Sequence, residues 1–401
     1  MMLPETLETF VASSPSPWHV VEQISALSQK AGAATLNEKT SWSIEPSSFY
    51  IIRRGCSCIL IKTPSKRIEK VKIVAAHTDS PALKVKPYPL AIKEGHALLQ
   101  LEPYGVPILS SWIGRDLRLS GMILRSGKQE LVDLNHAAFI PHIAFHLDRT
   151  VNDAGHQVLK HDHLFAMGKE HAFLNDPSIT FKDLFLVSDE KAEKLKDCDL
   201  IAGPRLDNLA CLYAAFAAFI GQKTNDADLL AFVAWNHEEI GSQSAEGALS
   251  PFLSDTLERI SFGFKLDRAK FLELKASTTL ISCDVAHGYH PNYPEKHDLK
   301  HTPKLGSGVV IKTNPNMRYS QTANLTGLFV RKLQEAQIPY SYFSLKNDMQ
   351  SGSTVGPLIS SQMGIETIDI GIPLLGMHSI RELVSGSDVQ ALEKSLSAFL
   401  S

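Results

Sequence analysis

Cysteine is scarce in this sequence, and long apolar runs are missing from it. The five cysteines among 401 residues are odd in number and scattered, which argues against a disulfide framework and favours a reducing compartment. No stretch approaches the roughly 20 apolar residues that a membrane span requires, and the first residues lack the basic and apolar regions of a secretory signal. These absences predict a cytoplasmic protein without a membrane partner.

The charge balance of the chain is nearly even. A formal net charge of −3 gives no electrostatic reason to expect nucleic acid or an anionic membrane as a partner. The composition, 44% hydrophobic and 21% charged, is that of a soluble globular protein. Because one domain usually has roughly 100–200 residues, we expect a chain of 401 residues to form two domains.

Short apolar runs of the kind found in buried strands recur along the chain. Segments with helical patterns separate them, including an Ala-, Leu- and Phe-rich segment at 207–221 and an amphipathic segment at 388–400. This alternation predicts an α/β fold, with a mostly parallel mixed sheet covered by helices on both faces. The predicted strands are residues 57–62, 71–76, 229–235, 280–283 and 367–370.

The middle of the chain has a different pattern. Shorter alternating segments, such as 117–124 and 130–134, are separated by glycines, which is typical of hairpins and not of βαβ units. We therefore expect a strand-rich second domain over residues 86–201. It is inserted into a first domain formed by residues 1–85 and 202–401.

Four of the apolar runs lead, at their carboxyl ends, to side chains that can bind a metal or move a proton. In open α/β sheets, ligands bind in the crevice beyond these ends of the strands, so the four segments are expected to converge. A further carboxylate, Asp207, opens one of the predicted helices and could also cap it. The four segments are His77-Thr78-Asp79, His237-Glu238-Glu239, Asp284-Val285-Ala286-His287 and Gly376-Met377-His378.

The types of side chain in these segments restrict the choice of metal. Imidazoles and carboxylates without a thiolate suit zinc, cobalt or manganese. The set is too large for one tetrahedral ion that keeps an open position for water. Two ions that share a bridging carboxylate, ~3.5–4 Å apart, would use it without strain.

The motifs that surround these residues resemble aspartyl aminopeptidase, in the M18 family of co-catalytic metallopeptidases. The resemblance extends in order from about residue 16 to the C-terminal helix and is weakest in the middle of the chain. It implies a fold of the zinc-exopeptidase type. The matching segments are His77–Ser80, Arg205–Asn208, His237–Ser242, Asp284–His287, His290–Tyr293, Gly352–Pro357 and Met377–Glu382.

The resemblance also implies a role for each metal-binding residue. His77 and Asp284 would bind one ion, Glu239 and His378 would bind the other, and Asp207 would bridge the two. Zinc is the expected metal, with cobalt or manganese as alternatives.

Two further residues are expected to serve the reaction. Glu238 would be the general base that accepts a proton from the attacking water and passes it to the leaving amine. Neighbouring residues of an extended segment point to opposite sides, so Glu238 and Glu239 are not expected to share one metal. Asp79 would accept the far imidazole N–H of His77 and orient that ring; a turn role for Asp79 is the alternative.

The resemblance implies substrate contacts and an assembly. His287 and Lys312 would line the pocket for the first side chain and favour Asp or Glu, although some relatives prefer neutral residues. Alternatively, Lys312 could be a strand residue whose charged end reaches solvent. His142 would reach a neighbouring subunit's active site from the inserted domain, which would serve as a dimerisation and lid domain. Dimers would assemble into a dodecamer.

The predicted function is therefore a two-metal aminopeptidase that releases N-terminal residues, Asp or Glu foremost, from peptides. A metal-dependent deacylase or dipeptidase of the same fold would share the metal ligands and differ in the pocket. A non-catalytic scaffold protein would keep the fold without turnover. Release of free Asp or Glu from peptides, compared with release of acyl groups from N-acyl amino acids, would separate these alternatives.

Overall fold

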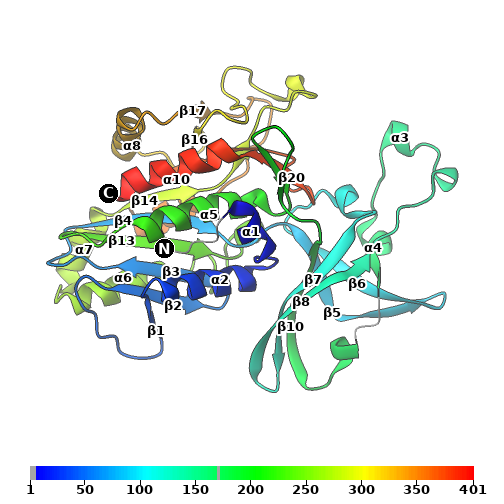
Figure 1. The fold of residues 1–401 in the computed structure, drawn as a ribbon, viewed down its shortest axis with the longest axis horizontal. Coiled ribbons are helices and arrows are strands. Elements are labelled where there is room, and N and C mark those ends of the chain that lie inside the picture. Colours follow the sequence, from blue (N-terminus) through cyan, green and yellow to red (C-terminus); the bar gives the residue numbers. More distant parts are fainter. Residues whose placement is uncertain (1–5, 169–171) are drawn as a thin grey trace.

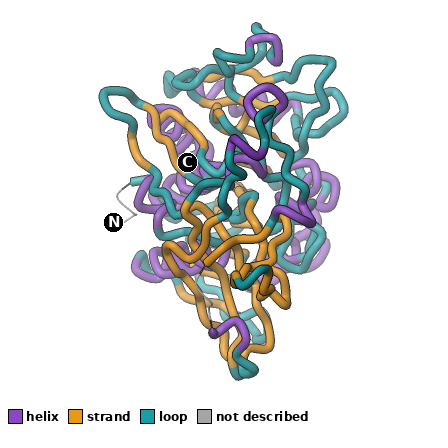
Figure 2. Tube along the Cα trace, turned by 90° about the vertical axis from the view of Figure 1, so that its right-hand side faces the viewer, coloured by secondary structure: helices purple, strands orange, loops and turns teal. Residues whose placement is uncertain are grey.

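The computed structural model of this protein describes residues 6–168 and 172–401. A helix-covered sheet forms one end of the molecule and a β-barrel forms the other (Figure 1). When the barrel side faces the reader, strands gather in the lower part of the molecule (Figure 2).

The larger layer is a mixed sheet with the order β1-β2-β3-β13-β4-β14-β18-β16-β17. The pairs β1–β2, β13–β4, β4–β14, β14–β18 and β16–β17 are parallel, and β2–β3, β3–β13 and β18–β16 are antiparallel. All the apolar runs predicted as strands lie in this sheet. Its strands are β1 (Ala34–Leu36), β2 (Phe49–Arg54), β3 (Ser57–Lys62), β4 (Lys70–His77), β13 (Asp228–Trp235), β14 (Thr279–Cys283), β16 (Val309–Lys312), β17 (Tyr340–Phe343) and β18 (Glu366–Gly371).

Helices cover both faces of this sheet, and the α/β class predicted from the sequence is confirmed. Alternate residues of β4 enter separate cores, because side chains of a strand point to opposite faces. Val74 belongs to the core that includes residues of α1, α2, α5, α8 and α10, whereas Ile73 belongs to the core that includes residues of α6, α7 and α9. The helices are α1 (Leu7–Ala12), α2 (Pro17–Lys30), α5 (Leu206–Gly221), α6 (Phe252–Gly263), α7 (Arg268–Ala276), α8 (Ala323–Glu335), α9 (Val355–Met363) and α10 (Gly386–Leu400).

The barrel is closed in the order β10-β5-β6-β9-β8-β7. It has its own apolar core, to which each strand contributes, for example Leu83, Leu99, Leu117, Val132, Ala166 and Leu184. Its strands are β5 (Ala82–Lys93), β6 (His96–Tyr104), β7 (Asp116–Arg125), β8 (Lys128–Phe139), β9 (Phe165–Gly168) and β10 (Ile179–Ser188). The predicted limits of the inserted domain, residues 86–201, stay a prediction.

A small third sheet and several short helical segments complete the fold. The sheet has the order β11-β12-β20-β19-β15, and it contributes to the wall of the site described below. Its strands are β11 (Glu193–Lys194), β12 (Leu200–Gly203), β15 (Ala286–His287), β19 (Pro373–Leu375) and β20 (Glu382–Ser385). The short helices are α3 (Val151–Ala154), α4 (Lys160–His163), η1 (Leu109–Trp112), η2 (Phe145–Leu147), η3 (Ala172–Asn175), η4 (Glu238–Ile240) and η5 (Pro294–Lys296).

Candidate active site

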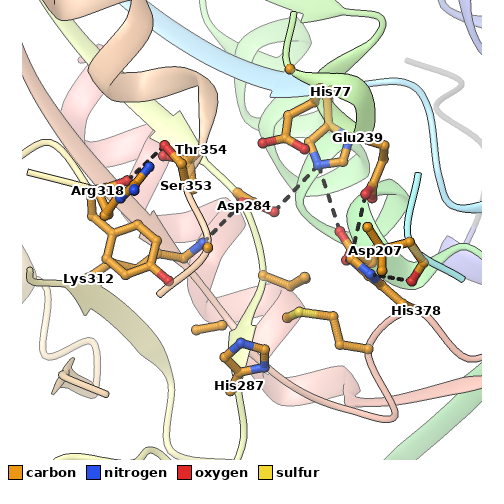
Figure 3. Close-up of a pocket in the computed structure, with 18 of the residues that line it drawn as sticks. His77, Asp207, Glu239, Asp284, His287, Lys312, Arg318, Ser353, Thr354 and His378 are labelled. Carbon is orange, nitrogen blue, oxygen red and sulfur yellow. Dashed lines mark hydrogen bonds and ion pairs between the residues drawn. The ribbon is translucent and has the colours of Figure 1, made fainter. Parts of the chain in front are cut away.

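The predicted polar segments converge at one edge of the large sheet. β4 ends at His77, Asp284 follows β14, and the turn between β19 and β20 contains His378. Together with neighbouring residues they line a cavity of 490 Å³, a size typical of small-ligand sites. Figure 3 shows that their side chains point toward one another. Every predicted site residue except Asp79 and His142 lines this cavity.

The two imidazoles approach different oxygens of one carboxylate. His77 Nε2 lies 3.7 Å from Asp207 Oδ1 and 3.5 Å from Asp284 Oδ1. His378 Nε2 lies 3.4 Å from Asp207 Oδ2 and 3.5 Å from Glu239 Oε2. Each imidazole therefore belongs to a three-residue group of possible metal ligands, and Asp207 is the member that both groups share.

The imidazole nitrogens and carboxylate oxygens of these residues are suited to binding divalent cations. The carboxylates of Asp207, Glu238 and Glu239 lie close together in a buried setting. Burial, followed by the charges of Asp207 and Glu238, raises the pKa of Glu239 well above its ordinary value. Several buried carboxylates that face one another are costly without compensation, and divalent cations bound by imidazole nitrogens and carboxylate oxygens supply that compensation.

The backbone of Glu238 and Glu239 differs from the extended segment assumed from the sequence. His237 has a left-handed backbone with φ of +66°, and the 3₁₀ turn η4 starts at the next residue. Consequently both carboxylates can approach His77, and the argument from strand alternation is wrong here. The two glutamates differ in one respect. Glu239, and not Glu238, also belongs to the group of possible metal ligands that contains Asp207 and His378.

Glu238 is largely desolvated. Burial is the main cause that raises its pKa to about 8; His77 opposes the rise, and Asp284 adds to it. A carboxylate with a raised pKa near the operating pH is suited to accepting and returning a proton.

Asp79 is completely buried, and its contacts differ in part from the prediction. The acceptor nearest to His77 Nδ1 is the backbone carbonyl of Asp79, at 3.1 Å, whereas the Asp79 carboxylate is 3.5 Å away. The carboxylate instead accepts the backbone N–H groups of Glu238 and Glu239, both at 3.1 Å, and the hydroxyl of Tyr104 at 2.8 Å. Asp79 therefore holds the turn that contains both glutamates.

Glu382 is a second buried carboxylate that binds the backbone of two site residues. Its side chain accepts the backbone N–H of Asp207 at 2.9 Å and that of His378 at 2.8 Å. Burial, followed by the charge of Asp207, raises its pKa well above the ordinary value. It lies in a segment singled out in the sequence, but its spacing from His378 did not indicate this role.

The cavity wall opposite His378 contains three basic side chains. Lys312 is only 2% exposed, with its Nζ 3.1 Å from Asp284 Oδ2, so the solvent-reaching alternative for this lysine is wrong. Burial, followed by Lys312, lowers the pKa of His287. Arg318 also lines the cavity, and it forms no ion pair within residues 6–168 and 172–401. The sequence analysis did not single out Arg318.

Comparison with known proteins gives the family. Residues 10–169 and 157–400 match the family described as aminopeptidase I zinc metalloprotease (M18). The chain belongs to the M18 family. The protein named "Probable M18 family aminopeptidase 2" of Streptomyces coelicolor is 37% identical over 421 aligned positions, covering 99% of this M18 chain and 97% of that protein. The protein of the same name from Pseudomonas putida is 36% identical and covers 97% and 96% of the two chains.

Solved structures agree with this M18 assignment. A chain in the cryo-EM structure of the Ape4 and Nbr1 complex has a TM-score of 0.92 and 30% identity, over 98% of this chain and 84% of that one. The S. cerevisiae mApe1 dodecamer has a TM-score of 0.85 and 25% identity, over 98% and 95%. The predicted family and enzyme class, a metallo-aminopeptidase, are confirmed, and use of a divalent metal, zinc, follows from the family. The deacylase, dipeptidase and scaffold alternatives gain no support.

Among the described residues, His142, unlike Asp79, neither lines the cavity of the M18 chain nor contacts a residue that does. It lies in the exposed segment after β8, with its ring 4.6 Å from that of His156 and its Nδ1 3.0 Å from the carbonyl of Ile143. A role in a neighbouring subunit's site needs a second chain, so that role stays a prediction. In the described part of the M18 chain, no helix combines the length and apolar character needed to cross a bilayer.

Proposed function

We propose that this M18 aminopeptidase binds two divalent ions, zinc foremost, with cobalt or manganese as alternatives. His77 and Asp284 would bind one ion, Glu239 and His378 would bind the other, and Asp207 would bridge them. The observation that supports this proposal is the position of Asp207, whose two carboxylate oxygens face different imidazoles at 3.7 and 3.4 Å. A carboxylate shared in this manner is typical of two-metal hydrolases.

The protein's own groups would then perform the proton transfers. When bound, the ions supply Lewis acidity at the scissile carbonyl and make water more acidic. Glu238 would accept the proton of the attacking water and return it to the leaving amine. Its turn is held by Asp79 through two backbone hydrogen bonds of 3.1 Å, so the carboxylate of Glu238 would be oriented before the substrate binds.

The metal assignment can be tested by counting ions in variants. We expect two ions per chain in the wild-type protein after dialysis, measured by mass spectrometry. His77→Ala and His378→Ala should each lose one ion, whereas Asp207→Asn should weaken both sites because it removes the shared ligand. One ion per chain in the wild-type protein, or loss of a single ion in Asp207→Asn, would contradict the two-ion proposal.

We propose that the enzyme prefers acidic first residues in a pocket lined by Lys312 and His287, and that Arg318 supplies most of the charge for this preference. Lys312 is already paired with Asp284 at 3.1 Å, and burial disfavours a charge on His287. Arg318 therefore offers the charge that is free to pair with a substrate carboxylate, and a guanidinium suits such a partner.

Kinetics with acidic and neutral substrates can distinguish the contributions of the Arg318 and Lys312 side chains. Arg318→Gln should lower kcat/KM for Asp and Glu substrates by roughly 10-fold relative to Leu substrates. Lys312→Met should lower it for all substrates, because Lys312 also contacts the metal-binding Asp284. Equal losses on acidic and neutral substrates in Arg318→Gln would remove this residue from the specificity pocket.

Assembly is the remaining part of the proposal. A relative with 25% identity has been solved as a dodecamer, and we propose that this chain also forms dimers that assemble into a dodecamer through the barrel domain. The segment that contains His142 exposes apolar side chains, with Ile143 42%, Phe145 50% and Leu147 77% exposed, which is typical of a contact surface. Mass determination by light scattering would test the assembly, and a monomer at micromolar concentration would contradict it.

A further inference from the structure

One short segment of the barrel contacts Glu239 and His378, the proposed ligands of one ion, and also the carboxylate of Asp79. It consists of Tyr104–Ile108, at the end of β6 and before η1, and we refer to it as the β6 segment. We propose that the β6 segment positions the catalytic groups, and that Tyr104 is a positioning residue for Glu238 and Glu239. This inference rests on the two-metal function proposed above.

Tyr104 acts on the glutamates through Asp79. Its hydroxyl donates to Asp79 Oδ2 at 2.8 Å, and the same carboxylate accepts the backbone N–H groups of Glu238 and Glu239. The barrel fixes the Tyr104 ring, which packs edge-on against Phe185 with 5.2 Å between centroids. Because Asp79 is completely buried, no solvent replaces a lost donor, and Asp79 Oδ2 would keep only its bond to the N–H of Glu239.

The rest of the β6 segment contacts Glu239 and His378. A Cβ atom at Gly105 would lie 3.2 Å from Cβ of Glu239, a contact tight enough to push that side chain by a few tenths of an ångström. The carbonyl of Val106 accepts the Nδ1–H of His378 at 3.0 Å, and the N–H of Ile108 donates to the carbonyl of His378 at 2.9 Å. The bond to Val106 leaves the other ring nitrogen of His378 free to bind an ion.

The two metal ligands with imidazole rings are therefore oriented from different parts of the fold. His77 receives its Nδ1 contact from Asp79, which follows β4 of the large sheet, whereas His378 receives it from Val106 of the β6 segment. The barrel consequently takes part in building the site as well as bordering it.

Removal of the Tyr104 hydroxyl tests the inference, and Tyr50 is the matched control. Both tyrosines are 5% exposed and both hydroxyls form a 2.8 Å hydrogen bond, but Tyr50 binds the N–H of Glu45. We expect Tyr104→Phe to lower kcat by roughly 10- to 100-fold with KM changed less than about threefold. Tyr50→Phe should keep wild-type kcat while losing similar thermal stability.

Metal retention gives a second measurement, and Gly95 is the matched control for Gly105. Both glycines have positive φ, +68° at Gly105 and +78° at Gly95, but nothing lies within 4 Å of a Cβ atom at Gly95. Gly105→Ala should lose at least one ion to a chelator about 10-fold faster than Gly95→Ala, because Glu239 is displaced. Tyr104→Phe should also lose metal faster than Tyr50→Phe.

The outcomes separate this inference from the proposed function. If the wild-type protein binds two ions and hydrolyses peptides, but each variant matches its control in kcat and in metal loss, the β6 segment has no positioning role. If the wild-type protein binds only one ion, the two-metal function fails instead.

Discussion

Asp79 and Asp388 use the same arrangement in two different regions of the molecule. Each is a buried carboxylate that accepts two backbone N–H groups: Asp79 those of Glu238 and Glu239, and Asp388 those of Gly306 and Gly308 at 2.7 and 2.6 Å. They are 0% and 1% exposed. Asp388 lies in α10 and does not line the catalytic cavity.

The two carboxylates differ in the groups that surround them and in the backbone segments to which they are hydrogen-bonded. Burial tends to raise the pKa of Asp79, but His77 and Tyr104 outweigh it and lower the pKa. Asp388 has no such partners, so burial raises its pKa to about 6. Asp79 is hydrogen-bonded to the turn of Glu238 and Glu239, which we propose to be catalytic, whereas Asp388 is hydrogen-bonded to a glycine-containing loop. We therefore expect loss of Asp79 to affect turnover and loss of Asp388 to affect stability.

The largest effect on turnover is expected at Glu238, whose backbone N–H donates to the Asp79 carboxylate. Glu238→Gln should keep both ions but lower kcat by roughly 10³-fold, because the general base is lost while the metal ligands remain. Turnover and metal content measured on the same preparation would check this. Turnover within about tenfold of the wild-type value would refute the assigned role.

The next effect compares the two carboxylates directly. Asp79→Asn replaces one acceptor oxygen with an N–H donor that faces the turn of Glu238 and Glu239, so kcat should fall by roughly 100-fold. Asp388→Asn makes the same replacement away from the cavity and should keep kcat within about twofold. Similar kcat values for the two variants would show that Asp79 acts on the fold and not on the site.

The smallest effect concerns the pH dependence of stability. The pKa of Asp388 is about 6 in the folded protein against an ordinary value of 3.8, so the folded state binds more protons between pH 4 and 6. The free energy of unfolding should therefore fall as the pH rises through this window, by about 2–3 kcal/mol from this residue. Asp388→Asn should flatten that slope, measured as urea midpoints at pH 4.5 and 6.5.

A nearby carboxylate provides the control for this experiment. Hydrogen bonds led by the backbone N–H of Ser387 lower the pKa of Asp199 to about 2. Its contribution to stability is lost only as the pH falls below about 4. The charge of Asp199 is also the smallest cause of the raised pKa of Asp388, so Asp199→Asn should reduce the slope between pH 4.5 and 6.5 only slightly. An unchanged slope in Asp388→Asn would contradict the assigned titration.

Much of the site could be predicted because its residues follow strong local patterns. The apolar runs in the sequence predicted the strands β4, β13, β14 and β18. The polar segments beyond the ends of these strands then predicted His77, Glu239 and Asp284 as site residues. The conformation of the Glu238–Glu239 turn was not predictable in this way, because it depends on hydrogen bonds to Asp79, a residue about 160 positions away in the chain. Arg318 was missed because a basic residue in a loop has no periodic pattern.

The sequence by itself determined the α/β fold class and the family, and it predicted a set of metal-binding side chains, since apolar periodicity and closely spaced motifs are local properties of the chain. Only the tertiary structure showed that the two carboxylate oxygens of Asp207, the residue predicted to bridge, face different imidazoles. It also showed that Glu382 accepts the backbone N–H groups of Asp207 and His378, and that Tyr104 of the barrel donates to Asp79. The contacts of Tyr104 with Asp79 and of Glu382 with Asp207 join residues 25 and 175 positions apart, so they depend on how distant parts of the chain pack together.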